Sequence, residues 1–233
     1  TVFHFAGLKS ISESISSPLQ YYLNNVSSTI KLLKIMEKYK VYEFIFSSSA
    51  TVYDSENEVP WKETDSTKQF KHPYAENKII IERLLKKISI SNKNWKIAVL
   101  RYFNPLGAHS SGLIGEFNIK NNTNLMPNIK KTFLGYQKYL SVYGGDFNTH
   151  DGTGIRDFIH IEDLIIGHLK AKEFINNKDG FYIWNLGAGR GYSVLEVIEK
   201  CSEIFNKKID YCIVNQRAGD LGEYYADIKK SKK

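Results

Sequence analysis

Short apolar segments alternate with longer amphipathic segments along most of this chain, and this alternation restricts the possible folds more than any other feature. Strand-like segments lie near 1–6, 42–48, 96–103, 181–187 and 209–214. Helix-like segments lie near 18–39, 73–90, 125–135, 162–176 and 193–205. Strands and helices that alternate in this way form a parallel sheet with helices on both faces. The pattern therefore predicts an α/β fold with a doubly wound parallel sheet.

The stretch from Asn104 to Asp157 interrupts this alternation. It is rich in Gly, Asn and His and holds one strand-like run at 140–143, so we interpret it as the beginning of a substrate lobe.

The chain has 233 residues, 42% hydrophobic and 24% charged, which is typical of a globular protein with a sizeable core. Its net charge of +7 is spread along the sequence, and this distribution argues against nucleic-acid binding.

Cysteine, histidine and apolar residues set further limits. Cys201 and Cys212 fall in an expected helix and an expected strand, which favours reduced thiols in a cytoplasmic protein over a disulfide framework. The six histidines lack the spacing of metal ligands, and no apolar run reaches membrane-spanning length. The chain begins at Thr1 and enters an apolar strand at once, so we expect it to be a fragment of a longer protein.

Tyr74 and Lys78 are four residues apart, which places both side chains on one face of a helix. An ammonium beside a phenol favours the phenolate, so we expect Lys78 to lower the pKa of Tyr74 and to let it take a proton. The serine run at 47–49 precedes this pair. A serine hydroxyl from this run can share, through a hydrogen bond, the substrate proton that Tyr74 would take. Serine, tyrosine and lysine in this order suit hydride-transfer chemistry on an alcohol.

A tyrosine and a lysine at this spacing are also common on helix surfaces, so the surrounding sequence has to decide between the two interpretations. The aromatic run at 42–46 ends in the three serines, as expected of a buried strand that opens into a loop. Pro73 suits the first position of a helix, with Tyr74 in the opening turn. Because ligands of open α/β sheets bind beyond the carboxyl ends of the strands, the serines and Tyr74 are expected to meet at a ligand site.

The glycine-rich segment at 185–191, Asn-Leu-Gly-Ala-Gly-Arg-Gly, matches a dinucleotide fingerprint only superficially. Its glycines occupy the first, third and fifth places of the motif, whereas the fingerprint needs the first, third and sixth. The acidic residue downstream, Asp210, precedes a strand-like run instead of ending one. We therefore expect a tight turn between a strand and a helix.

Several longer motifs occur in a fixed order over nearly the whole chain. They are HFAGLK at 4–9, SSSATVY at 47–53, RYFNPLGAH at 101–109, NLMP at 124–127, DGTGIRD at 151–157 and NLGAG at 185–189. In this order they resemble the UDP-glucose 4-epimerase family, which is part of the extended short-chain dehydrogenase/reductase group.

The resemblance implies a Rossmann-like sheet whose amino-terminal units are missing here, and a smaller substrate-binding lobe. It implies a partial NAD-binding domain at 1–104 and a mixed segment at 105–233, in which Rossmann elements return near 141–187. It also implies NAD-dependent interconversion of UDP-glucose and UDP-galactose through a 4-keto sugar that rotates before it is reduced again. Tyr74 would take the 4-hydroxyl proton, Ser49 would bind the same hydroxyl, and Lys78 would hold the nicotinamide ribose.

Other residues match positions of the family one by one. The cofactor contacts that the resemblance implies are Phe5, Ala6, Gly7, Lys9, Asn24, Ser49, Tyr74, Lys78 and Phe103. The UDP-sugar contacts that it implies are Ser49, Tyr74, Asn104, Asn124, Leu125, Ser141, Tyr143, Arg156, Arg217, Asp220 and Tyr224. Among these, the two arginines match diphosphate contacts, where a planar guanidinium suits phosphate oxygens, and Tyr224 matches a position beside the C2 substituent of the sugar. The resemblance also leaves room for a homodimer of the full-length protein.

The chain departs from the family's pattern at several places. Gln216 replaces a second arginine near the diphosphate, and Asp54 replaces a glycine after the motif that ends at Tyr53. The family's two opening βα units, with their glycine-rich turn, have no counterpart here, and neither does its carboxyl-terminal end. We therefore expect residues 1–233 alone to be inactive, to bind no NAD measurably and to dissolve poorly, and the full-length protein to be an epimerase.

Two alternatives stay open at this point. A different sugar-nucleotide-modifying enzyme of the same group would share the fold, but dehydratases carry an acidic pair where this chain has Ala50 and Thr51. A non-catalytic, cofactor-sensing protein of the same fold is the other alternative. The presence of Ser49, Tyr74 and Lys78 together argues against it.

Overall fold

The computed structural model describes residues 1–67, 72–116, 124–217 and 219–232. They form two compact units, and each unit is built from separate stretches of sequence. The first unit comprises Thr1–Tyr102, Ile165–Leu186 and Ile228–Lys233, and the second comprises Phe103–Leu164 and Gly187–Asp227. The assignment of a cofactor domain to 1–104 and of a mixed segment to 105–233 stays a prediction.

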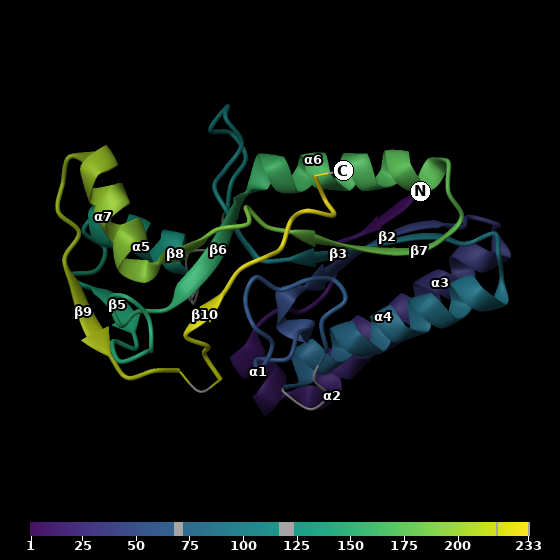
Figure 1. Ribbon diagram of the computed structural model, residues 1–233, viewed down its shortest axis with the longest axis horizontal. Helices are drawn as coiled ribbons and strands as arrows, with labels where there is room; N and C mark the ends of the chain where they lie inside the picture. The colour runs from purple at the N-terminus through teal and green to yellow at the C-terminus, as the bar shows by residue number, and fades with distance from the viewer. Residues whose placement is uncertain (68–71, 117–123, 218, 233) are drawn as a thin grey trace. The chain divides into compact units, whose positions relative to one another are not determined.

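Four parallel strands form the sheet of the first unit. Their order is β1 (Val2–His4), β2 (Glu43–Ser49), β3 (Lys96–Tyr102) and β7 (Gly180–Leu186). The register pairs Phe46 with Val99 and Val99 with Ile183. Helix α6 (Ile161–Asn176) covers one face, and α3 (Ser28–Lys38) and α4 (Pro73–Ser91) cover the other (Figure 1). The predicted parallel sheet with helices on both faces is confirmed.

Apolar side chains between the sheet and the pair α3 and α4 form the main core of this unit. The buried members are Val26, Leu33, Met36, Phe44, Phe46, Ile81, Leu85, Trp95, Ile97 and Val99. Each large apolar side chain of this kind contributes about 1.5–3 kcal/mol when it is completely buried. This core therefore holds α4 firmly against β2 and β3.

Local signals explain where α4 begins. Pro73 lies in the first turn, where its missing N–H costs no hydrogen bond. The His72 ring nitrogen Nδ1 accepts a hydrogen bond from Ala75 N at 3.1 Å and so caps the helix. The predicted helix at 73–90 is confirmed.

The predicted helix at 18–39 is present in three parts. It consists of α2 (Pro18–Tyr21), a π-helix η1 (Tyr22–Ser27) and α3. A short helix, α1 (Ile11–Ser16), precedes it, capped by the Ser10 side chain, and the sequence analysis missed it. π-helical turns inside helices are rare and are often found at functional sites.

The second unit has a separate sheet. Strands β10 (Glu223–Tyr224), β6 (Ile155–His160) and β4 (Asn104–Leu106) are parallel, and β8 (Gly191–Ser193) pairs antiparallel with β6. A two-stranded parallel sheet joins β5 (Leu140–Tyr143) to β9 (Tyr211–Val214). Helices α5 (Leu125–Phe133) and α7 (Val194–Phe205) share a buried apolar cluster with β5.

Strands β4, β6, β8 and β10 lie outside the strands that the sequence pattern predicts. The reason is clearest in β6, whose buried positions are Ile155, Asp157 and Ile159. A charged residue at the central buried position hides the alternation of apolar and polar residues by which strands are recognised. The other three strands have only two or three residues each.

The Asp157 carboxylate organises the glycine-rich segment that follows β7. It accepts hydrogen bonds from the backbone N–H groups of Ala188 at 2.6 Å, Gly189 at 3.0 Å and Ala226 at 3.0 Å. Backbone N–H groups that would have to face a phosphate in a dinucleotide site are thus bound to a carboxylate of the same chain. The predicted turn is present, although β8 lies between it and α7.

We expect Asp157→Ala to lower the free energy of unfolding by about 2–4 kcal/mol, because three N–H groups lose their acceptor. Asp157 is completely buried. Burial raises the pKa of its carboxyl group, and the three N–H groups act in the opposite direction. Asp157→Asn keeps one acceptor oxygen and should lose less. Thermal or urea unfolding measures both variants, and an unchanged midpoint for Asp157→Ala would contradict the expectation.

Candidate active site

Ser49, Tyr74 and Lys78 lie close together in the first unit. Ser49 is the last residue of β2, and Tyr74 and Lys78 lie in the first turns of α4. Ser49 and Tyr74 share a hydrogen bond, and Lys78 Nζ lies 5.8 Å from the centroid of the Tyr74 ring. A hydroxyl, a phenol and an ammonium are thus neighbours at the carboxyl edge of the parallel sheet.

The surroundings of Lys78 hold its ammonium in one position. Nζ donates a hydrogen bond to Ser47 O at 2.7 Å and lies 4.8 Å from the centroid of the Phe46 ring. Burial lowers the pKa of Lys78 to about 8, and the nearby Glu82 carboxylate acts in the opposite direction. Lys78 therefore carries its charge at neutral pH and loses it at moderately alkaline pH.

Tyr74 differs from the expectation in its proton affinity. Burial raises the pKa of the phenol, and the hydrogen bond with Ser49 opposes this rise without cancelling it. The prediction that Lys78 lowers the pKa of Tyr74 is therefore wrong for this structure. Removing a phenolate from water costs more than the hydrogen bond with Ser49 returns, so Tyr74 is protonated at neutral pH.

A hydrogen-bonded group that the sequence analysis missed lies next to Lys78. The Tyr102 hydroxyl donates to Ser47 Oγ at 2.6 Å and is also hydrogen-bonded to His168 Nε2. Burial raises the pKa of Tyr102, the bond to Ser47 opposes the rise, and the nearby Tyr74 adds to it. The positions of Ser47 and Tyr102 near the carboxyl ends of neighbouring strands were the available signal.

The other candidate cofactor residues of the first unit, apart from Ser49, Tyr74 and Lys78, are exposed. Phe5, Ala6, Gly7 and Lys9 follow β1 directly, and Asn24 lies on the π-helix η1; all five are exposed. Asn25, which is buried, fixes the loop, since its side chain donates to Leu8 O at 3.0 Å and accepts from Leu8 N at 2.8 Å. Phe103 belongs to the second unit.

Two candidate substrate residues form a stacked pair in the second unit. The Arg156 guanidinium lies 4.6 Å from the centroid of the Tyr224 ring. Its Nη1 donates to Gly222 O at 3.3 Å, which ties β6 to the segment before β10. The Tyr224 ring lies beside Phe103, with 6.2 Å between the ring centroids. The structure thus brings together three residues that were predicted at distant sequence positions.

A second cluster of candidate residues also belongs to this unit. The Arg217 guanidinium lies 4.7 Å from the centroid of the Tyr143 ring, and its Nε donates to Asp220 Oδ2 at 2.9 Å. Ser141 and Tyr143 are the exposed residues of β5. An aromatic ring, a cation and an anion at one exposed place can accommodate a base, a phosphate and a sugar hydroxyl.

The remaining candidates are Asn104, Asn124 and Leu125. Asn104 begins β4, and its buried Oδ1 has no hydrogen-bond partner among the described residues, as expected of an acceptor that awaits a ligand. Asn124 is the residue before α5, and Leu125 is its first residue. Asn124 Nδ2 donates to Glu116 Oε1 at 3.3 Å.

The two substitutions that depart from the family's pattern are both accommodated locally. Gln216 Nε2 donates to Asp146 Oδ1 at 2.7 Å. The Asp54 N–H donates to Ser66 O at 3.0 Å, and its carboxylate accepts from Glu56 N at 3.1 Å. Asp54 is not among the residues with positive φ, so this turn does not require a glycine.

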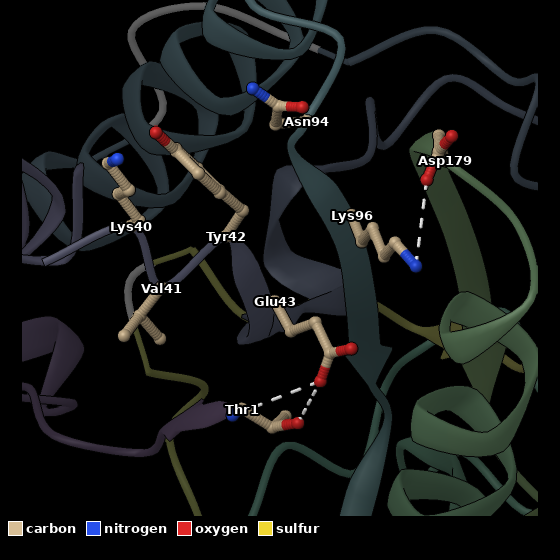
Figure 2. A pocket seen from close by; sticks show the side chains of 8 residues that line it. All are labelled: Thr1, Lys40, Val41, Tyr42, Glu43, Asn94, Lys96 and Asp179. Carbon is tan, nitrogen blue, oxygen red and sulfur yellow. Dashed lines mark hydrogen bonds and ion pairs between the residues drawn. The ribbon is translucent and has the colours of Figure 1, made fainter.

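A hollow of about 410 Å³ lies at the opposite, amino edge of the same sheet (Figure 2). Two ion pairs lie in its lining: the Thr1 amino group with Glu43, and Lys96 with Asp179 at 3.6 Å. Ligands of parallel sheets bind beyond the carboxyl ends of the strands. The candidate site is therefore at the edge that carries Ser49 and not in this hollow.

Three further features of the described residues bear on other kinds of site. No group of three or more His, Cys, Asp or Glu side chains is arranged to hold a metal ion. Within the same residues, no helix has the length and apolar character needed to cross a membrane. Cys201 and Cys212 are both free.

Comparison with known proteins adds independent information. Residues 1–187 match the model of the NAD dependent epimerase/dehydratase family. The chain is 44% identical to UDP-glucose 4-epimerase of Pasteurella multocida, and the match covers 100% of this chain and 69% of that protein. It is 43% identical to the human UDP-glucose 4-epimerase, and the match covers 97% of this chain and 65% of that protein. A crystal structure of UDP-glucose 4-epimerase from Bifidobacterium longum in complex with NAD+ and UDP superimposes with a TM-score of 0.94 at 45% identity, over 99% of this chain and 69% of that one. The chain thus spans about two thirds of these relatives, and it belongs to the NAD dependent epimerase/dehydratase family, beside the UDP-glucose 4-epimerases.

Proposed function

We propose that the full-length protein interconverts UDP-glucose and UDP-galactose, a reaction of galactose metabolism, by NAD-dependent oxidation and re-reduction at C4 of the sugar. One observation carries the proposal. A serine, a tyrosine and a lysine meet at the carboxyl edge of a parallel sheet, in a chain that resembles UDP-glucose 4-epimerases over its whole length. A hydroxyl, a phenol and an ammonium are the groups that alcohol oxidation requires.

NAD fits the residues of the first unit. The exposed loop after β1 and the exposed Asn24 lie at the sheet edge where cofactors bind. Lys78 has three N–H donors, and with one of them bound to Ser47 O the others can donate to ribose hydroxyls. When bound, NAD supplies the nicotinamide ring that takes the hydride from C4 and returns it. The residues that would hold it are Phe5, Ala6, Gly7, Lys9, Asn24, Ser49, Tyr74, Lys78 and, from the second unit, Phe103.

The protein's own groups move the proton. Ser49 orients the 4-hydroxyl of the sugar. Tyr74, which must first lose its own proton, takes the hydroxyl proton as a phenolate while the carbon is oxidised and so becomes a phenol. The Lys78 ammonium stabilises the phenolate before it accepts this proton. After the 4-keto sugar has turned over, the Tyr74 phenol returns the proton to the carbonyl oxygen as the carbon is reduced. The high proton affinity that burial gives Tyr74 favours the first transfer, and the Lys78 ammonium assists the return by stabilising the phenolate that is left.

The second unit would hold the rest of the substrate. Arg156 and Arg217 offer planar guanidinium groups to the diphosphate. Ser141 and Tyr143 would bind the uracil, Asp220 the uridine ribose, and Tyr224 would lie beside the sugar ring. The unpaired Oδ1 of Asn104 is a further acceptor for the UDP-sugar, and Asn124 and Leu125 complete the set.

A titration of the full-length protein with UDP-galactose tests this function. We expect the nicotinamide absorbance to change on substrate addition and UDP-glucose to accumulate until the two sugars reach equilibrium. An absorbance change without turnover would indicate a cofactor-sensing protein. Accumulation of a 4-keto-6-deoxy sugar would indicate a dehydratase, which the absence of an acidic pair at Ala50 and Thr51 disfavours.

We expect kcat to fall as the pH rises through about 8, because the charged form of Lys78 is the active one. The pKa of this lysine in the folded protein lies below its ordinary value, so it loses its proton at a pH where a free lysine stays charged. A pH–rate profile measures this. Lys78→Arg keeps its charge over the whole range, so the alkaline decline should be absent from its residual activity. A wild-type profile that is flat up to pH 10 would refute the assignment.

We further propose that the protein forms a homodimer in the cytoplasm. Ile15 of α1, Leu19 of α2 and Leu23 of η1 are large apolar side chains that are 59%, 79% and 67% exposed. Groups of exposed apolar side chains often mark protein–protein interfaces. The free Cys201 and Cys212 accord with a reducing compartment. Leu19→Glu should convert a dimer into a monomer in sedimentation experiments, and a wild-type monomer would rule out this arrangement.

A further inference from the structure

Glu82 and Arg101 form a buried ion pair next to the candidate catalytic residues. Arg101 Nε donates to Glu82 Oε1 at 3.1 Å, and Nη2 donates to Oε2 at 2.7 Å. The Glu82 side chain is only 8% exposed and the Arg101 side chain only 4%. Two parallel hydrogen bonds between planar groups fix orientation as well as distance. The pair therefore joins α4 to β3 in one defined geometry.

The same pair also holds the strand that ends in Ser49. The Ser48 hydroxyl donates to Glu82 Oε1 at 2.5 Å. On the other side of Ser49, the Tyr53 ring lies 4.7 Å from the Arg101 guanidinium. Ser48 directly precedes Ser49, and Tyr53 follows it after a single 3₁₀ turn. The ion pair therefore contacts the chain both before and after Ser49.

Glu82 further belongs to the helix that carries the other two residues. It lies one turn after Lys78 and two turns after Tyr74 on α4. Alternate side chains of a strand point to opposite faces, and Phe46 and Ser48 of β2 both contact α4. A carboxylate bound at once to β2 and to β3 therefore sets how far α4 can slide or rotate over the sheet.

The energetics of such a pair favour a role in position over a role in stability. Burying two charges costs several kcal/mol per ion, so an apolar pair of similar volume is often as stable or more stable. Catalysis is more sensitive than stability to where these groups lie, because a displacement of about 1 Å between reacting groups can lower a rate by about 10²-fold.

We propose that Glu82, Arg101 and Ser48 are positioning residues, which hold Tyr74 and Lys78 at the working distance from Ser49. The inference rests on the proposed function. None of the three touches the substrate in this assignment; they act through the helix and the strand that carry the catalytic groups. Ser48→Ala removes a single hydrogen bond and leaves the ion pair intact, Glu82→Gln removes the charge and keeps the shape, and Arg101→Lys removes the planar fork and keeps the charge.

The test measures kcat, KM for UDP-galactose and the NAD content of each purified full-length variant, well below its unfolding temperature. We expect kcat to fall about 3- to 10-fold for Ser48→Ala and about 10- to 100-fold for Glu82→Gln and Arg101→Lys, with KM and NAD content within about twofold of wild type. Ser89→Ala is the matched control. Ser89 is a buried serine of α4 whose hydroxyl donates to Lys86 O within the helix, and its loss should leave kcat unchanged.

The pH profile supplies a readout that a purely structural role would not move. In the described part of the chain, the titratable groups near Lys78 are Glu82 and Tyr74 on α4, His4 on β1 and Tyr102 on β3. Loss of the Glu82 charge should move the alkaline decline of kcat to lower pH, whereas Ser48→Ala should leave it in place.

The outcomes separate the two proposals. If the wild-type protein has no epimerase activity, the proposed function fails. If it is active and the folded variants match its kcat and pH profile, the positioning role is overturned. Should Glu82→Gln or Arg101→Lys fail to fold, Ser48→Ala alone decides, since a kcat equal to that of Ser89→Ala would overturn the proposal.

Discussion

Replacing Tyr74 with phenylalanine is expected to lower kcat of the full-length protein by about 10²–10⁴ and to leave UDP binding nearly unchanged. The substitution removes only the phenolic oxygen, which is the atom that exchanges a proton with the 4-hydroxyl. The ring stays beside Lys78 Nζ, and the candidate diphosphate contacts belong to other segments of the chain. The loss should therefore appear in turnover and not in affinity for the nucleotide.

Turnover of the two sugars and calorimetric titration with UDP measure the two quantities. Tyr22→Phe is the matched control, because the Tyr22 hydroxyl donates to Glu76 Oε2 at 2.5 Å on the same helix and takes no part in the proposed chemistry. Its kcat should stay close to that of the wild type. Turnover of Tyr74→Phe at the wild-type rate would remove this tyrosine from the mechanism.

The second large effect concerns substrate range. We expect the wild-type enzyme to prefer UDP-glucose and UDP-galactose over UDP-N-acetylglucosamine by roughly 10- to 200-fold. In the proposed site, Tyr224 fills the space beside the C2 substituent, and forcing an N-acetyl group against a packed ring costs about 1–3 kcal/mol. The ring is held between Arg156 and Phe103, so it cannot move aside without breaking both contacts. Tyr224→Cys should widen the range.

The ratio of kcat/KM for the two kinds of sugar is the measurement of choice. Tyr224→Cys also removes the ring beneath the Arg156 guanidinium, which should weaken both substrates, and the ratio cancels this common loss. Tyr225→Cys is the control, because Tyr225 neighbours Gly191 of β8. A wild-type enzyme equally active on acetylated and unacetylated sugars, or a ratio that changes only for Tyr225→Cys, would show that Tyr224 does not limit the pocket.

Much of the fold could be predicted from the sequence because its strongest signals are local. The aromatic strand before Ser49, and Pro73 at the start of α4, are recognisable within a few residues, and both lie where the pattern placed them. The four-residue spacing of Tyr74 and Lys78 is a local signal of the same kind, and it predicts that both lie on one helix. It could also be expected that a strand end and a helix start would meet at the carboxyl edge of the sheet.

The rest depends on contacts between residues far apart in the sequence. Asp157 is buried in β6 because three backbone N–H groups from other segments bind it, and none of them can be inferred from its neighbours. The pKa of Tyr74 is set by how deeply the phenol is buried, which depends on the packing of the whole unit. The ion pair of Glu82 and Arg101 likewise joins a helix to a strand, and neither residue is distinguished by a motif.

The composition of the first unit from separate stretches has a consequence for how the chain is made. β3 pairs along its whole length with β7, and the two strands lie roughly 80 residues apart in the sequence. During synthesis the ribosome therefore releases β3 well before its neighbour exists. In that interval the row of N–H and C=O groups along β3 is a template on which another nascent chain can pair. We therefore expect the nascent chain to be prone to association in the interval between the synthesis of β3 and that of β7.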